Sequence, residues 1–194
     1  MLQSPIRAAA LGMLIVQLAV GGAAAQEAAS PALLSPDRLK ELYFDAAREG
    51  RVDLLDGLIK VGGMTVDTRD PRGFTPLILA AYSGKLAAVD FLIGHGADPC
   101  AVDPKGNSSL MGVAFKGDTK VAARLLAERC DVNAANHAGQ TALMMAALFG
   151  RTEVVQLLVE NGADPKLKDL SGNTAASLAR QQGNEAMAAL IENK

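Results

Sequence analysis

The sequence predicts an all-α solenoid, in which similar helix-turn-helix units stack in a row and are joined by hairpin-like turns. Three columns of residues recur every 33 positions: glycines at a turn, hydroxyl residues shortly after it, and large aliphatic residues further on. These columns are Gly73, Gly106, Gly139 and Gly172; Thr75, Ser108, Thr141 and Thr174; and Leu92, Leu125, Leu158 and Ile191. A fixed period of this length is the signature of a stacked repeat architecture.

The first half of each unit predicts a tight turn followed by a helix. Asp70 lies three residues before Gly73, and glycine adopts the positive φ of such a turn without steric cost. The Thr75 hydroxyl can then cap the first helix, and Pro76 fits its first turn, where no backbone N–H is needed. Gly84 is expected to end this helix in the left-handed conformation.

The second half of each unit predicts another helix. Val89, Leu92 and Ile93 have the i, i+3, i+4 spacing of one apolar helix face. Gly96 is expected to end this helix, and an extended segment then leads into the next turn. The unit is therefore turn, helix, short turn, helix.

The motifs within this order resemble the ankyrin repeat. They are TPL at 75–77, GAD at 96–98 and again at 162–164, and DVNA at 131–134. The resemblance is strong over 70–194, and 37–68 resembles a degenerate first repeat. It implies an ankyrin-repeat solenoid whose function is to bind another protein.

The sequence divides into three parts. We predict a signal peptide at 1–25, a disordered tail at 26–36 and an ankyrin-repeat domain at 37–194. Within the domain we expect a cap at 37–69, full repeats at 70–102, 103–135 and 136–168, and a C-terminal repeat at 169–194.

The N-terminus has the layout of a secretory signal peptide. Arg7 is followed by a largely apolar run at 8–20, and Ala23-Ala24-Ala25 precedes Gln26, so cleavage is expected after Ala25. The alternative is an uncleaved membrane anchor, for which the run is short and rich in alanine and glycine. Cleavage predicts a periplasmic or secreted protein without membrane association.

Composition argues against several function classes. Aromatic residues make up 4% of the chain although 49% is hydrophobic, as suits thin helical layers packed through Ala, Leu and Val. The formal charge is −2, and nucleic-acid binding requires a clustered basic face that the sequence lacks. His95 and His137 occupy non-equivalent positions and are interpreted as exposed loop residues. We find no catalytic residues, metal ligands or cofactor motif, and expect a monomer that is not an enzyme.

The histidine that usually follows TPL in the family is absent. Ile78, Met111, Met144 and Ser177 replace it. The resemblance implies that this histidine ties repeats together by hydrogen bonding, so packing is expected to supply more of the cohesion. The thioethers of Met111 and Met144 leave a soft-metal site open, but we favour adaptable packing.

The second full repeat departs most from the pattern. Gly112 lies inside its first helix, and Arg129-Cys130-Asp131 replaces GAD, which removes the glycine cap. We interpret these changes as tolerated drift, with a hinge as the alternative. Cys100 and Cys130 are not in register, and packed helices lie about 8–10 Å apart, whereas a disulfide needs Cα atoms within about 7 Å. Two free thiols are therefore expected.

In ankyrin domains partners usually contact the turn tips and the exposed side of each first helix. Aromatic, basic and other large residues occupy these positions. The predicted partner-binding residues are Arg72, Phe74, Tyr82, Lys105, Phe115, Lys116, His137, Leu148 and Phe149. Exposed rings beside basic residues are typical of interfaces. The alternative is that the rings close gaps between repeats.

The resemblance thus implies an exported scaffold or regulator of a periplasmic or envelope protein, whose identity the sequence does not reveal. One alternative is an inhibitor or immunity-type protein that blocks a toxic enzyme. A second alternative, from a different class, is a soft-metal-binding protein.

Overall fold

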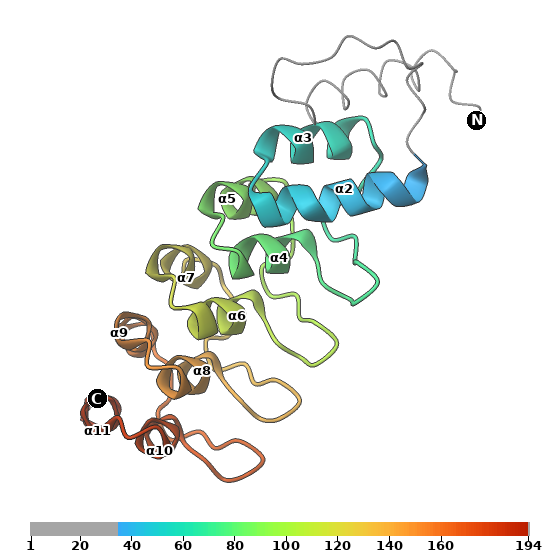
Figure 1. Cartoon of the computed structure of the whole chain (residues 1–194). Helices are drawn as coiled ribbons and strands as arrows, with labels where there is room; N and C mark the ends of the chain where they lie inside the picture. The colour runs from blue at the N-terminus through green and yellow to red at the C-terminus, as the bar shows by residue number, and fades with distance from the viewer. Residues whose placement is uncertain (1–34, 194) are drawn as a thin grey trace.

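A computed structural model describes residues 35–193 and shows ten helices in this part of the chain, stacked in five pairs (Figure 1). The first helices are α2 (Pro36–Glu49), α4 (Pro76–Tyr82), α6 (Ser109–Lys116), α8 (Ala142–Leu148) and α10 (Ala175–Gln181). The second helices are α3 (Val52–Lys60), α5 (Leu86–Gly94), α7 (Thr119–Leu126), α9 (Thr152–Glu160) and α11 (Glu185–Glu192). The fold is the predicted all-α repeat solenoid.

The helices form two parallel rows (Figure 1). The row of first helices lies between the row of second helices and the hairpin-like turns, which all project from the same side. The turns and the first helices therefore border one common face along the stack.

The predicted caps start the first helices. Each capping hydroxyl accepts a hydrogen bond from the backbone N–H three residues later, at 3.2 Å for Thr75 and Thr174 and at 3.3 Å for Ser108 and Thr141. The glycine just after each first helix has positive φ, as at Gly84 (69°). Local sequence thus sets where these helices begin and end.

The first helix of the cap begins at Pro36, one residue before the predicted boundary of the domain. Its N-cap is Ser35, whose Oγ accepts a hydrogen bond from the Arg38 N–H at 3.3 Å. The predicted signal peptide at 1–25 and most of the predicted tail at 26–36 lie outside the described residues. Among residues 35–193, every helix is too short or too polar to cross a bilayer.

A continuous core runs between the helix pairs. The aliphatic column Leu92, Leu125, Leu158 and Ile191 is at most 4% exposed. Met111 and Met144 are each 2% exposed and belong to this core, so their thioethers have the packing role that we favoured from the sequence.

Packing is not the only force between repeats, because polar contacts also join neighbouring turns. The His137 N–H donates to the Lys105 carbonyl at 3.0 Å, and the Leu170 N–H donates to the Ala138 carbonyl at 3.0 Å. Further along, Arg151 Nε donates to the Phe115 carbonyl at 3.0 Å. Hydrogen bonds between repeats therefore add to the cohesion that packing supplies.

The prediction of two free thiols is wrong, because Cys100 and Cys130 form a disulfide with their Cα atoms 5.5 Å apart. The prediction assumed the spacing of packed helices, but both cysteines lie in loops that follow second helices. There the chain of one repeat contacts the next: Asp67 Oδ1 accepts a hydrogen bond from the Asp98 N–H at 3.1 Å. Positions about 30 residues apart are therefore neighbours in these loops, although they are out of register in the helices.

The second full repeat ends its second helix early. Helix α7 stops at Leu126, whereas the equivalents of Ala127 in the adjacent repeats are still helical. The bond from Ala97 N–H to Leu92 O that closes α5 has a counterpart at Ala163, but the described backbone shows none at Cys130. Drift does not account for the whole departure, because Cys130 takes part in the disulfide.

Candidate functional site

A groove of about 780 Å³ crosses the common face of turns and first helices, from the cap to the third full repeat. Five of the predicted partner-binding residues line it: Arg72, Phe74, Tyr82, Lys105 and Phe115. The remaining lining residues were not predicted from the sequence: Arg48, Ile78, Leu79, Ser83, Asp103, Asn107, Ser108, Ser109, Met111, Gly112 and Met145.

Three rings from successive repeats form a continuous aromatic strip along this face, which we define as Tyr82, Phe115 and Phe149. The Tyr82 and Phe115 rings are stacked with centroids 6.1 Å apart, and Phe115 meets Phe149 edge to face at 4.4 Å. Tyr82 and Phe149 are nevertheless 45% and 41% exposed. The strip thus bridges repeats and also presents apolar surface to solvent.

Two residues of the second repeat shape the strip around Tyr82. A Cβ atom added at Gly112 would lie 3.3 Å from Tyr82 Cδ2, so the glycine leaves room for the ring against α6. On the ring face, Lys116 Nζ lies 4.9 Å from the centroid, a favourable cation–π distance. Gly112, which weakens a helix by about 1 kcal/mol relative to alanine, therefore has a structural role beside the groove.

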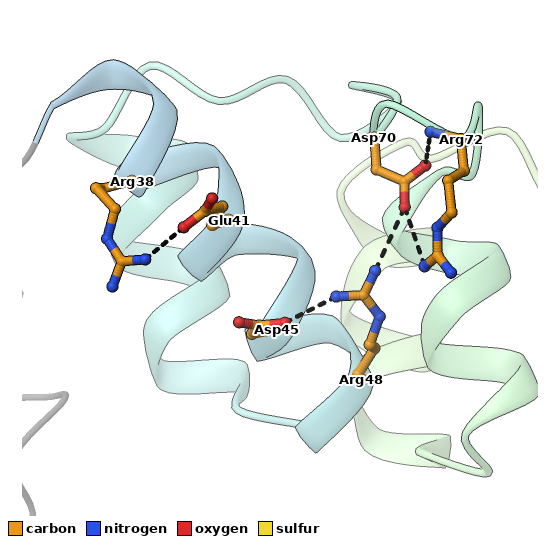
Figure 2. Close-up of polar contacts among 6 residues, drawn as sticks. All are labelled: Arg38, Glu41, Asp45, Arg48, Asp70 and Arg72. Atoms are coloured by element: carbon orange, nitrogen blue, oxygen red, sulfur yellow. Dashed lines mark hydrogen bonds and ion pairs between the residues drawn. The ribbon is translucent and has the colours of Figure 1, made fainter.

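Buried Asp70 organises the end of the groove nearest the cap (Figure 2). Its Oδ1 accepts hydrogen bonds from the backbone N–H groups of Arg72 and Phe74, both at 2.9 Å. Its Oδ2 lies 3.3 Å from Arg48 Nη2 and 3.4 Å from Arg72 Nη2. Two guanidinium groups thus converge on one carboxylate, and that of Arg72 lies 5.2 Å from the Phe74 ring centroid.

Arg48 belongs to a short series of charges along α2. Figure 2 shows the Arg38–Glu41 pair one turn before Asp45, and Asp45 Oδ1 lies 2.7 Å from Arg48 Nη1. Arg48 therefore bridges Asp45 on the exposed side of α2 and Asp70 in the first turn. The cap is joined to the first full repeat by this ion pair.

The next turn repeats the arrangement around Asp103. Asp103 Oδ1 accepts hydrogen bonds from the backbone N–H groups of Lys105 and Asn107, at 2.8 and 2.9 Å, and its Oδ2 accepts one from Asn107 Nδ2. The carboxylate is used inside the turn. No carboxylate within residues 35–193 lies at ion-pair distance from the Lys105 ammonium group, which stays available at the groove.

The other predicted positions lie beyond the groove lining. His137 is exposed at its turn tip, and Leu148 is half-buried against the core. Leu148, rather than Phe149, occupies the column of Tyr82 and Phe115, since it lies 33 residues after Phe115. Phe149 is the residue just after α8. Phe149 reaches the strip through its contact with Phe115.

Aligning the cap with the full repeats could have predicted one more residue of the groove. The cap is one residue longer than the full repeats, and allowing for this places Arg48 in the Tyr82 column. Other lining residues gave no such signal: Ser109 occupies a position held by Pro76 in the preceding repeat. Ser109 is 2% exposed, and its Oγ finds no hydrogen-bond partner among the described protein atoms.

The groove combines apolar side chains, exposed rings and cationic groups. This is the chemistry of a surface that takes a polypeptide segment, with rings as anchors and charges for orientation. In residues 35–193, no three His, Cys, Asp or Glu side chains gather closely enough to hold a metal ion.

Comparison with known proteins agrees with the repeat geometry. The family model described as ankyrin repeats (3 copies) matches residues 6–103 and 110–194. The chain belongs to the ankyrin-repeat family. Ankyrin repeats generally mediate protein–protein interaction, and ankyrin-repeat proteins are typically non-enzymatic binding scaffolds.

Individual ankyrin-repeat relatives match over short segments. The chain is 43% identical over 60 residues to Ankyrin repeat domain-containing protein 29 of Danio rerio, which is 31% of this chain and 20% of that protein. It is 43% identical over 53 residues to DNA-binding protein RFXANK of Homo sapiens, covering 27% of this chain and 20% of that protein. With Ankyrin repeat domain-containing protein 49 of Bos taurus it shares 42% identity over 62 residues, covering 32% and 26%. The chain thus spans about a fifth to a quarter of the length of these relatives.

Proposed function

We propose that this ankyrin-repeat protein is an exported binding module, a scaffold or regulator that holds a periplasmic or envelope protein in the groove. The observation that supports this most is the aromatic strip: Tyr82 and Phe149 remain 45% and 41% exposed, and the exposed Lys116 lies against the Tyr82 ring. Aromatic side chains that remain partly exposed in the folded protein are typical anchors of protein interfaces.

Ring truncation tests the binding surface. Tyr82→Ala, Phe115→Ala and Phe149→Ala are each compared with the unmodified chain in melting temperature and in capture of the same partner from periplasmic extract. An interface anchor costs about 2 kcal/mol or more in binding, so capture is lost while melting stays near normal. A buried core ring would instead cost about 3–5 kcal/mol in folding.

A ring outside the groove provides the control. Phe91 lies on α5, next to His95 with centroids 4.0 Å apart, and is half-buried. Phe91→Ala should retain capture whatever its effect on melting. Retained capture in all three strip variants would rule out the strip as the binding surface.

Export is supported by the signal-like layout of residues 1–25, and it is tested separately. Removal of these residues is expected because Ala23 and Ala25 satisfy the small-residue preference of the cleavage site. Intact-mass measurement of the protein recovered from the periplasm should show a chain that begins at Gln26. A chain that still begins at Met1 would contradict both cleavage and the proposed compartment.

A further inference from the structure

We infer that the groove takes an extended partner segment in which acidic residues flank an aromatic or large aliphatic side chain. This inference rests on the proposed function, because it specifies the chemistry of the partner that the same groove would bind.

The accessible charge at the groove is positive. Arg48, Arg72 and Lys105 line it, whereas the nearby acids Asp70 and Asp103 are only 7% and 8% exposed. Both carboxylates already accept hydrogen bonds from the backbone of their own turns. A partner approaching the groove therefore meets cations, although the chain as a whole has a formal charge of −2.

The positive charge continues along the aromatic strip. Lys116 is exposed and holds its ammonium group 4.9 Å from the Tyr82 ring centroid. Within the described part of the chain, neither Lys105 nor Lys116 has a carboxylate at ion-pair distance. Two cations without a carboxylate partner thus lie on the same face, one at the groove and one at the aromatic strip. Carboxylates of a partner would complement them.

The groove also has an apolar part. Tyr82 and Phe115 form stacked rings that line it, and Ile78 and Met111 contribute apolar side chains beside them. An aromatic or large aliphatic side chain of the partner would bury apolar area here, while carboxylates on either side reach the cations. Acidic residues next to an apolar anchor therefore match both features.

A single-stranded nucleic acid also pairs rings with cations, but the groove favours a polypeptide. Polyphosphate binding requires a clustered basic face. Here two of the cations, Arg48 and Arg72, already lie at ion-pair distance from Asp70, which leaves the separate lysines Lys105 and Lys116 for a partner. Carboxylates at intervals suit this distribution better than a phosphate at every nucleotide.

Selection from a library of short random peptides, using the immobilised full chain, tests the inference. Selected peptides should be enriched in Asp and Glu beside Phe, Leu or similar residues, relative to the unselected library. Their affinity should fall about 2- to 5-fold for each of Lys105→Gln and Lys116→Gln, the range for exposed charge pairs. The matched variants Lys120→Gln and Lys168→Gln change exposed lysines that neither line the groove nor lie against a ring of the aromatic strip, and these variants should bind unchanged.

Salt provides a second readout. Raising the ionic strength from about 0.1 to about 1 M shortens the screening length from about 10 to about 3 Å. Peptide affinity should fall over this range in the unmodified chain, and it should fall less in the Lys105→Gln/Lys116→Gln double variant. Circular dichroism of each variant establishes that it remains folded.

The outcomes separate this inference from the proposed function. Peptides that lose binding with Tyr82→Ala or Phe115→Ala but show no acidic enrichment would overturn the inference and leave the protein-binding function standing. If no selected peptide depends on the groove residues, both are overturned. Tighter, lysine-dependent binding of a labelled single-stranded oligodeoxythymidine would overturn the choice of a polypeptide.

Discussion

At the scale of single residues, one acceptor position holds every turn in place. Asp70, Asp103 and Asp169 each accept two backbone N–H bonds through Oδ1, and Asn136 does the same with its amide oxygen at 2.9 Å to both Ala138 N and Gln140 N. The turn therefore requires a side-chain oxygen that can accept both backbone N–H bonds, and a negative charge on that oxygen is not needed for these bonds. This explains why the column holds Asn as well as Asp.

The charge still makes the last turn sensitive to acid. The backbone N–H of Asn173 is the main cause that lowers the pKa of Asp169. Because the folded pKa lies below the unfolded value of about 3.9, the carboxylate stabilises the fold above that pH, and this contribution is lost as the pH falls through the folded pKa. Amide hydrogen exchange of residues 171–173, measured relative to the intrinsic exchange rate at each pH, should therefore accelerate below about pH 4.

Asp169→Asn should remove this part of the acid response, because Asn136 shows that an amide oxygen keeps both backbone bonds. A matched control is Glu153→Gln, since Glu153 is exposed on α9 and lies outside the turn. That control should retain the acid response of residues 171–173. The same acceleration in Asp169→Asn would show that another group is responsible.

At the scale of elements, the loops after the second helices connect neighbouring repeats. Asn133 accepts a hydrogen bond from the Asp164 N–H at 2.8 Å and donates to the Gly162 carbonyl at 3.3 Å. Asp67 has the equivalent role toward Asp98. Cys100 occupies the same column between them and makes the connection covalently, through Cys130. The disulfide therefore replaces a polar contact and fastens the second full repeat, whose second helix ends before those of the adjacent repeats.

Breaking the disulfide should destabilise the domain. It closes a loop with a sequence separation of 30, for which the unfolding free energy is expected to fall by about 2–4 kcal/mol on reduction. Denaturant unfolding with and without a thiol reductant measures this. Cys100→Ser/Cys130→Ser should match the reduced protein and show no response to reductant.

A second double variant provides the matched comparison. Cys100→Asn/Cys130→Ala restores the residues found at Asn133 and Ala163 in the next repeat, so it should recover part of the lost stability without a covalent bond. Two free thiols in non-reduced protein from an oxidising compartment would contradict the disulfide. Equal stability of both double variants would contradict the polar connection.

At the scale of the whole molecule, stability comes from contacts between neighbouring repeats. Each internal helix pair packs on the pair before it and the pair after it, as the stack in Figure 1 shows. The terminal pair α10–α11 has a neighbour on one side only. In such an array stability is approximately a sum of unit and nearest-neighbour terms, so the position of a defect decides how far it spreads.

Truncating equivalent core residues in different repeats should therefore destabilise different numbers of neighbouring helices. Leu158 and Ile191 occupy the same column, and both are 0% exposed. Either change to alanine removes about 2–5 kcal/mol of local stability. Leu158→Ala should raise hydrogen exchange in α7, α9 and α11, whereas Ile191→Ala should raise it mainly in α10 and α11. Uniform acceleration by both variants would indicate a single cooperative unit instead.

The sequence by itself determined the features that depend on local chemistry or on strict repetition. The first helices begin at Thr75 and its equivalents because these hydroxyl residues cap them. They end at Gly84 and its equivalents because glycine readily adopts positive φ. Both properties depend on the local residue type alone. The aliphatic column followed from the period of 33, and the exposed rings followed from its variable positions. Repetition makes these features recognisable in the sequence, because equivalent positions have the same structural role in neighbouring repeats.

The tertiary structure decided the features that depend on contacts between non-equivalent positions. Cys100 and Cys130 meet because adjacent loops pass each other out of register, and Gly112 makes room for a ring from the preceding repeat. Register places Arg48 in the Tyr82 column, but only the structure shows its ion pair with Asp70, which lies 22 residues away. Comparing equivalent columns cannot reveal such pairs, since their proximity is set by how the chain crosses between repeats.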